Sequence, residues 1–226
     1  MAGRKQRADV ESAPRLSDVA YARLLEVVFQ RRLPPGAFVS QNELVKLTGV
    51  PVGPLRDALR SLEADGIVTI HPRAGIEFVK PGMELARATY QFRGIMETAA
   101  VAVYSETGDE AEMEDLERRH LRAVETVEAS GLSQEVRDEL DELEALLHNA
   151  IVGSQRNPII ERSYRRVHNY LRILRLERKI TSPLALRSLR EHLAIIAACR
   201  RRDPAEAQSA LATHFANALQ RNMGLY

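Results

Sequence analysis

The segment 37–79 constrains the fold of this chain more than any other part of the sequence. Ser40 and Glu43 have the spacing of a capping box, in which each residue satisfies an unpaired backbone N–H at the start of a helix. Gly49 suits the left-handed turn that often ends such a helix. A second helix then places its apolar side chains at the spacing of one buried stripe: Leu55, Ala58, Leu59 and Leu62. The pattern predicts two short helices joined by a tight turn.

A β-hairpin is expected directly after these helices. Gly66 ends the second helix, and apolar runs at 67–70 and 76–79 flank the turn Pro72-Arg73-Ala74-Gly75. Helix, turn, helix and hairpin in this order form a winged helix-turn-helix, which presents one helix and a hairpin tip to DNA. The alternative is an ordinary α+β subdomain, because short helices with solvated arginines are common.

Candidate DNA contacts lie opposite the apolar stripe and at the hairpin tip. Arg56 and Arg60 are one turn apart on the second helix and can reach phosphates or base edges. Arg73 supplies a cation at the tip of the hairpin. The full set expected at DNA is Ser40, Asn42, Val52, Gly53, Arg56, Arg60, Arg73 and Gly75.

Residues 16–80 resemble the N-terminal domain of GntR-family bacterial transcription regulators almost without gaps, including the link Leu33-Pro34-Pro35-Gly36. The resemblance implies sequence-specific binding to double-stranded DNA. Members of that family usually enter the recognition helix through Ser-Arg-Thr, where the serine caps the helix and the arginine reads a base. This chain has Pro51-Val52-Gly53 there instead.

This departure bears on which operator is recognised. Pro51 offers no capping oxygen, a loss of about 1 kcal/mol of helix stability. Val52 cannot make the bidentate contact to guanine that discriminates by roughly 1–3 kcal/mol. Arg56 still occupies the second arginine position of the family pattern. We therefore expect DNA binding to an operator that differs from the common one or is read through its shape.

Length and charge favour two modest domains. Residues 1–80 hold 12 basic and 9 acidic residues, and the remainder holds 20 and 22, which gives a weakly basic head on a weakly acidic body. The single cysteine, Cys199, excludes an intrachain disulfide and a multi-cysteine zinc site. It suits a cytoplasmic protein.

No segment of the sequence indicates a membrane protein. The longest apolar run, 193–199, is far too short to span a bilayer. Residues 1–15 lack the apolar stretch of a signal peptide and are expected to form a disordered arm.

An all-α antiparallel helical bundle is expected after the boundary at Pro81-Gly82, so that the chain is mainly α and its second domain covers 81–226. Asp203-Pro204 and Ser182-Pro183 each read as a helix cap followed by a proline at the first helical position. The six expected helices are 84–106, 109–130, 133–154, 157–179, 183–201 and 204–222.

The histidines of this bundle carry a second functional signal. Glu144 and His148 are one turn apart beside an apolar stripe, and His192 and His214 each lie among apolar residues on later helices. An inward-facing carboxylate needs a partner, because burying an unpaired charge is costly. A divalent metal would satisfy this carboxylate. Zinc is the metal that we expect, with nickel or manganese as alternatives. The competing interpretation is that these histidines are hydrogen-bonded core residues.

Three segments resemble the FCD ligand-sensing domain of one large GntR subgroup: FRGIMETAAVAV, EALLHNAIVGSQRNPII and REHLAIIAACRRRDPAEAQSALATHF. Six helices fit its shorter, VanR-like form. The resemblance implies that Glu144, His148, His192 and His214 bind a metal, although the family usually has aspartate at the first position.

The same resemblance implies that a small organic carboxylate binds at the metal and that Arg93 closes on it. The alternative for Arg93 is a salt bridge to Glu97 at i+4. His168 also faces inward and is expected beside the effector or as a substitute ligand. His71 and His120 are left as surface or packing residues.

The expected function is a homodimeric transcription regulator, not an enzyme. Two wings address two half-sites of a palindromic operator, and the effector releases a repressor from it. Two rival classes remain: a metal-dependent hydrolase, since His and Glu in a bundle can activate water, and a constitutive DNA-binding protein whose bundle only dimerises. No nucleophile or additional base accompanies the metal candidates, which disfavours the enzyme.

Overall fold

The computed structural model describes residues 14–176 and 180–222 of the chain. Its contacts divide the chain into two compact units, one ending at Lys80 and the other beginning at Pro81. Most of the expected N-terminal arm, 1–13, lies outside the described residues. The first unit contains α1 (Leu16–Phe29), β1 (Phe38–Val39), α2 (Gln41–Thr48), α3 (Val52–Ala64), β2 (Val68–His71) and β3 (Gly75–Phe78).

The two central helices of this unit form for the reasons that the sequence predicts. Ser40 Oγ accepts a hydrogen bond from the backbone N–H of Glu43 at 3.2 Å, and the Glu43 carboxylate accepts one from the Ser40 N–H at 2.7 Å. Gly49 ends α2 in the left-handed conformation, with φ of 67°. All four apolar side chains of the α3 stripe are buried. The predicted winged helix-turn-helix is confirmed.

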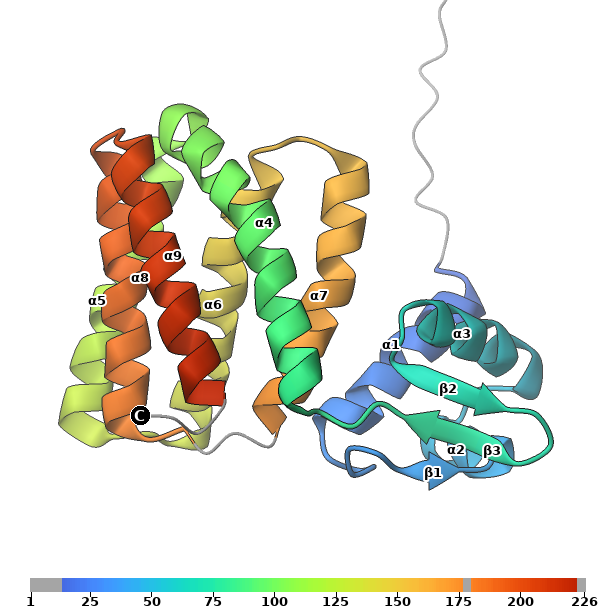
Figure 1. Ribbon diagram of the computed structural model, residues 1–226. Helices are drawn as coiled ribbons and strands as arrows, with labels where there is room; N and C mark the ends of the chain where they lie inside the picture. Colours follow the sequence, from blue (N-terminus) through green and yellow to red (C-terminus); the bar gives the residue numbers. More distant parts are fainter. Residues whose placement is uncertain (1–13, 177–179, 223–226) are drawn as a thin grey trace, which may run out of the picture. The chain divides into compact units, whose positions relative to one another are not determined.

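The wing contains a strand that the sequence did not indicate. The three strands have the order β1-β3-β2 and pair antiparallel, with Phe38 opposite Glu77 and Val68 opposite Phe78 (Figure 1). Strand β1 has only two residues, too few to show a period of two. The paired segments 68–71 and 75–78 are each displaced by one residue from the apolar runs that predicted them, because His71 pairs with Gly75 at the turn.

Gly75 is required by the packing of the wing. A Cβ at this position would lie 2.7 Å from Phe38 Cε1 and 3.0 Å from the backbone oxygen of Val39. We expect Gly75→Ala to destabilise the first unit by about 1–3 kcal/mol, as overpacking does. Gly53 is the matched control, because nothing lies within 4 Å of the corresponding Cβ. Gly53→Ala, in the first turn of α3, should change the stability by less than about 0.5 kcal/mol. Thermal unfolding of both variants checks this prediction, and equal effects would contradict it.

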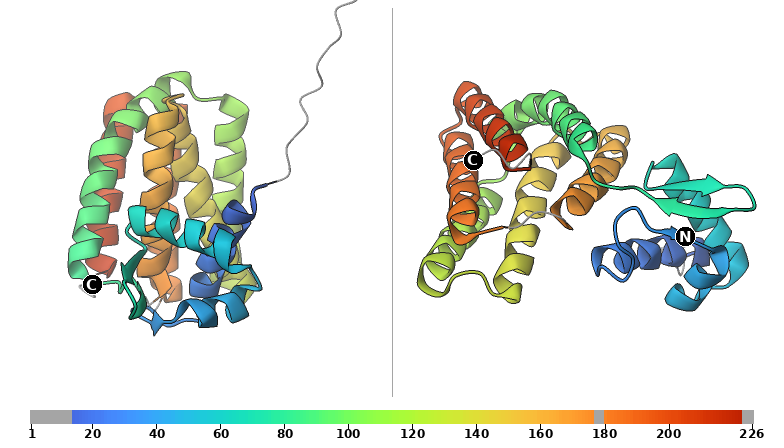
Figure 2. Two further views of the ribbon diagram at one scale, coloured as in Figure 1. Left: turned by 90° about the vertical axis from the view of Figure 1, so that its right-hand side faces the viewer. Right: turned by 60° about the horizontal axis from the view of Figure 1, so that its bottom comes forward.

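The second unit is a bundle of six helices within the described residues: α4 (Met83–Thr107), α5 (Glu110–Ser130), α6 (Gln134–Gly153), α7 (Pro158–Leu176), α8 (Ser182–Arg200) and α9 (Pro204–Asn222). Helix α9 packs between α4 and α8, and α5 packs between α8 and α6. Helix α6 returns to α4, which closes a ring, and α7 lies against α4 and α6 (Figures 1 and 2).

The six expected helices agree with the structure to within a few residues; the expected end of one at 179 falls outside the described residues. One start is corrected. Asp203 caps α9 as predicted, with its carboxylate accepting the Glu206 N–H at 3.0 Å. Ser182, however, is the first residue of α8 rather than its cap. Thr181 holds the cap position and makes no side-chain capping bond, so Pro183 alone favours this start.

The interior of the bundle is mostly apolar. Leu147, Ile151, Ile195 and Leu211 belong to a buried apolar cluster that all the ring helices share. Buried ionisable side chains interrupt this core: Arg93, Glu97, His120, Glu144, His148, His192, His214 and Arg221. Such residues are rarely buried without partners, and their arrangement therefore identifies the candidate site. Among the described residues, no helix has the length and apolar character needed to cross a membrane.

Candidate metal centre and DNA-binding surface

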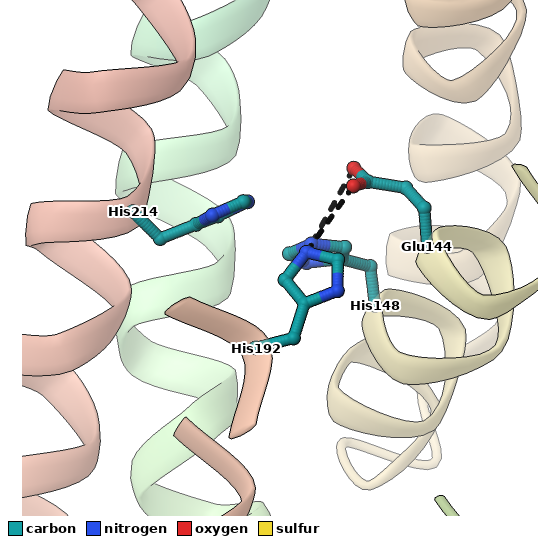
Figure 3. A group of neighbouring side chains, drawn as sticks. All are labelled: Glu144, His148, His192 and His214. Atoms are coloured by element: carbon teal, nitrogen blue, oxygen red, sulfur yellow. Dashed lines mark ion pairs between the residues drawn. The ribbon is translucent and has the colours of Figure 1, made fainter. Parts of the chain in front are cut away.

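Three helices of the bundle bring the expected metal ligands together. Glu144 and His148 lie one turn apart on α6, His192 comes from α8 and His214 from α9 (Figure 3). One potential ligand atom from each of the four residues lies within 4.8 Å of the others. All four side chains are buried. One carboxylate and three imidazoles in a compact group are a donor set that suits zinc, nickel or manganese.

The histidines present one nitrogen to the group and use the other elsewhere. The Nε2 atoms of His148, His192 and His214 are buried and make no hydrogen bond among the described residues, although those of His148 and His192 lie 3.4 and 3.3 Å from the Glu144 carboxylate. Each Nδ1 has one: Glu97 at 2.5 Å from His148, His120 at 3.1 Å from His192, and Glu191 at 2.9 Å from His214. An imidazole whose Nδ1–H is held by an outer partner presents the lone pair of Nε2 to a metal. The residues present therefore fit a divalent metal ion.

Glu144 is surrounded by cations and imidazoles. Its Oε1 lies 2.8 Å from Arg175 Nη2 and 3.2 Å from Arg93 Nη1, and its Oε2 lies 3.3 Å from His192 Nε2. Burial by itself would raise the pKa of this carboxyl, but Arg175 and His148 hold the pKa well below its usual value. Glu144 is therefore ionised and available as a ligand at neutral pH.

Arg93 and Glu97 form an ion pair in which both side chains are completely buried. Arg93 Nε donates to Glu97 Oε1 at 2.6 Å, and the hydroxyl of Tyr164 donates to the same oxygen at 3.0 Å. Burial opposes ionisation of Glu97, but Arg93 and His148 lower the pKa of Glu97 to about 2. The salt bridge between Arg93 and Glu97, which the sequence offered as the alternative to an effector role for Arg93, is therefore present. Even so, Arg93 Nη2 is buried and has no hydrogen-bond partner among the described residues.

His168 lies beside this centre but outside the four-residue group. It is half-buried on α7, and burial, with Arg175 and Arg172 nearby, lowers the pKa of its imidazole to about 4. It is therefore neutral at physiological pH, as are the three candidate ligands, whose pKa values are lowered mainly by burial.

These pKa shifts predict acid sensitivity of the metal-free protein. Burial lowers the pKa of His120 from 6.5 to about 3, so the unfolded chain takes up a proton that the folded chain excludes. Stability is therefore lost as the pH falls below about 6.5, by about 2 kcal/mol for His120 alone at pH 5. Glu97, with its lowered pKa, adds a further loss below about pH 4.5. Thermal unfolding between pH 8 and pH 4 checks this, and a flat profile would contradict it.

Four outer residues of the centre were not predicted in these roles. Glu97 entered only as the alternative partner of Arg93, His120 was left unassigned, and Glu191 and Arg175 were not considered. Position offers weak signals for three of them: Glu191 precedes His192 directly, Glu97 follows Arg93 by one turn, and His120 continues the buried face of α5 that contains Leu116. Their partners lie on other helices, which sequence periodicity does not reveal.

The residues of the first unit that we expect at DNA are mostly exposed, as that role would require. Arg60 is exposed, and Val52 has 41% of its surface exposed. Arg56, which we expect to reach phosphates or base edges, donates from Nε to Gln41 Oε1 at 3.3 Å. Arg73 is exposed in the turn, with φ of 64°. Asn42 is also exposed, whereas the side chain of Ser40 is engaged in the helix cap.

The unusual start of α3 is less unfavourable than the sequence suggested. Pro51 occupies the cap position and makes no side-chain capping bond, as predicted. The third helical residue is Pro54, which has no backbone N–H. One of the donors that a capping oxygen would normally satisfy is therefore missing, so replacing the family's serine by proline costs less than the full value of a cap.

Comparisons with known proteins agree with this architecture. A family model described as "FCD domain" matches residues 88–217, more than half of the chain, and one described as "Bacterial regulatory proteins, gntR family" matches residues 16–78. Over 195 residues the chain is 25% identical to an uncharacterized HTH-type transcriptional regulator, YdhC of Bacillus subtilis, covering 86% of this chain and 85% of that protein.

Solved structures of low sequence identity share the fold. E. coli McbR/YncC has a TM-score of 0.76 at 16% identity and covers 95% of this chain and 100% of its own. A putative GntR transcriptional regulator from Rhodococcus sp. RHA1 has a TM-score of 0.74 at 20% identity and covers 93% and 98%. The chain therefore belongs to the GntR family of bacterial DNA-binding transcription regulators, in the subgroup whose C-terminal part is an FCD domain.

Proposed function

We propose that this regulator binds one divalent metal ion, with zinc as the favoured metal, through Glu144, His148, His192 and His214. The bound metal then supports binding of a small organic carboxylate. Three buried Nε2 atoms without hydrogen-bond partners carry the metal part of the proposal. Leaving one buried polar atom unpaired is costly, and three around one carboxylate are unexpected unless something else binds them.

Charge is the argument for an anionic effector. Arg93 and Arg175 face Glu97 and Glu144, so these four side chains carry no net charge before an ion binds. A divalent cation would add two positive charges in a buried site, and an anion that binds with it offsets them. When bound, the metal supplies open coordination positions to a carboxylate oxygen.

Helix α4 offers donors for such a ligand. The Nη2 of Arg93 and the hydroxyl of Thr89, one turn earlier, are both buried and lack a hydrogen-bond partner among the described residues. A guanidinium matches the geometry of a carboxylate. Arg93 therefore keeps a donor for the effector despite its salt bridge with Glu97, and His168 is a neutral neighbour.

The size of the site connects the effector to regulation. A cavity of about 30 Å³ touches Glu144, Arg175 and His192. That volume holds one or two water molecules, not a carboxylate of several heavy atoms. The effector must therefore bind a more open arrangement of the helices. A ligand that prefers one arrangement shifts the population towards it, and we infer that this releases a homodimeric repressor from a palindromic operator.

The proposal is tested by fluorescence anisotropy of the full chain on DNA from upstream of its own gene and on scrambled DNA, across a salt series. The zinc-loaded protein should bind the upstream DNA with an affinity that survives salt better than binding to the scrambled control. Acetate, succinate and citrate serve as probes, and at least one should weaken operator binding. Arg93→Lys keeps the charge but loses the guanidinium fork, and should bind zinc and DNA but respond less.

Specific outcomes would contradict each part. Equal operator affinity of zinc-loaded and chelator-treated protein, with and without each carboxylate, would favour a constitutive DNA-binding protein. Absence of preference for any upstream DNA, together with zinc-dependent ester hydrolysis, would favour the metal hydrolase. Membership of a family of transcription regulators supports the proposed effector-responsive regulator over the metal hydrolase.

A further inference from the structure

We propose that His120 is a positioning residue for the metal centre, which fixes the tautomer and the orientation of His192 through a relay that ends at a backbone carbonyl. The inference rests on the metal site proposed above. It concerns a residue of α5, a helix that contributes none of the four candidate ligands.

The direction of each hydrogen bond in the relay follows from the backbone carbonyl of Leu116, at which the relay ends. His120 Nδ1 lies 2.7 Å from the carbonyl oxygen of Leu116, which can only accept, so Nδ1 carries the proton. In the neutral imidazole, His120 Nε2 then has the lone pair. It lies 3.1 Å from His192 Nδ1, which must donate. His192 is left with a lone pair on Nε2, the atom that lies 3.3 Å from the Glu144 carboxylate.

His192 differs in this respect from the other two candidate ligands. His148 and His214 donate from Nδ1 to the carboxylates of Glu97 and Glu191, and each carboxylate is in turn paired with an arginine. A carboxylate at the Nδ1 of His192, in the place of His120, would add a negative charge that needs another buried cation. The neutral relay holds the tautomer without changing the charge of the centre.

Burial and packing make the relay rigid. The side chain of His120 is fully buried, and its ring lies edge-on to that of His192 with centroids 5.2 Å apart. Without an acceptor at this place, the Nδ1–H of His192 would be buried and unpaired. The ring could find a partner for this N–H by turning, or it could avoid the unpaired N–H by moving the proton to Nε2. Either change removes the Nε2 lone pair from the metal.

Two amide substitutions test the relay as a matched pair. The amide of glutamine reaches about as far as histidine Nε2, whereas that of asparagine reaches only as far as Nδ1. His120→Gln can therefore still accept from His192, and His120→Asn cannot. We expect the zinc affinity of the asparagine variant to fall about 10–100-fold, and that of the glutamine variant to fall by less than about 10-fold.

The measurement is a competition of the full chain with a chromogenic zinc chelator, repeated by cobalt(II) absorption, which reports the ligand geometry. Thermal unfolding of the metal-free variants checks that they are folded. His71→Gln, in the wing and remote from the bundle ligands in sequence, is the control and should bind zinc like the wild type.

The outcomes separate this inference from the metal site itself. Wild-type protein that fails to bind zinc would overturn both. If the wild type binds zinc but the two folded amide variants lose zinc affinity equally, the role of His120 would be overturned. The same holds if neither variant loses zinc affinity, and in both cases the metal site itself would remain. A changed cobalt spectrum in the asparagine variant only would support the relay.

Discussion

Replacement of Glu97 by glutamine should destabilise the metal-free bundle by about 3–5 kcal/mol. This is the cost expected when one partner of a fully buried ion pair loses its charge. Glu97 is completely buried, and its carboxylate accepts from Arg93, His148 and Tyr164. A glutamine amide can replace one oxygen, but it leaves the guanidinium of Arg93 with only Glu144 as a counter-charge. Urea unfolding of the full chain, followed by circular dichroism, measures the loss.

A double-mutant cycle makes this prediction specific. Arg93→Met combined with Glu97→Gln should be less destabilising than the sum of the single changes, because neither charge is then left without its partner. Glu128→Gln is the matched surface control. Glu128 is about half exposed and pairs with Arg190 at 2.9 Å, and its loss should cost less than about 1 kcal/mol. Similar losses for Glu97→Gln and Glu128→Gln would show that the buried pair does not support the fold.

Replacement of His214 by phenylalanine should have the largest effect on the metal. Losing a direct ligand must cost more than the 10–100-fold that loss of an outer partner costs, so we expect zinc affinity to fall by more than about 100-fold. Side effects should be limited, because Glu191 keeps its two hydrogen bonds with Arg221, at 2.9 and 2.7 Å, when His214 is absent.

Thermal unfolding with added zinc gives the readout. Zinc at 100 times the wild-type Kd should stabilise the wild type by about 2.7 kcal/mol, and the same concentration should stabilise His214→Phe by less than about 0.5 kcal/mol. His71→Gln should respond like the wild type. An unchanged zinc response in a folded His214→Phe protein would remove His214 from the ligand set.

The sequence was sufficient to assemble the inner part of the candidate centre. Glu144 and His148 follow from their i, i+4 spacing, and His192 and His214 follow from single polar positions on otherwise apolar helix faces. The outer partners were not accessible in this way. His120 and His192 are 72 residues apart, and only the packing of α5 against α8 makes one the partner of the other.

In the DNA-binding unit, too, some features could be predicted from the local sequence and others could not. The cap of α2 and the stripe of α3 follow from residues within one or two turns of each other. Strand β1 depends instead on pairing with a distant strand. Gly75 was predicted as a DNA contact, but the space beside it is filled by Phe38, so packing alone accounts for a glycine there.

The central claim is that one divalent ion binds among Glu144, His148, His192 and His214. Anomalous diffraction at the zinc edge, from crystals of the zinc-loaded full chain, tests it most directly. We predict one strong anomalous peak per chain, within bonding distance of the Glu144 carboxylate and the three Nε2 atoms. A zinc-loaded crystal with no peak there, or with its only peak at other residues, would contradict the account.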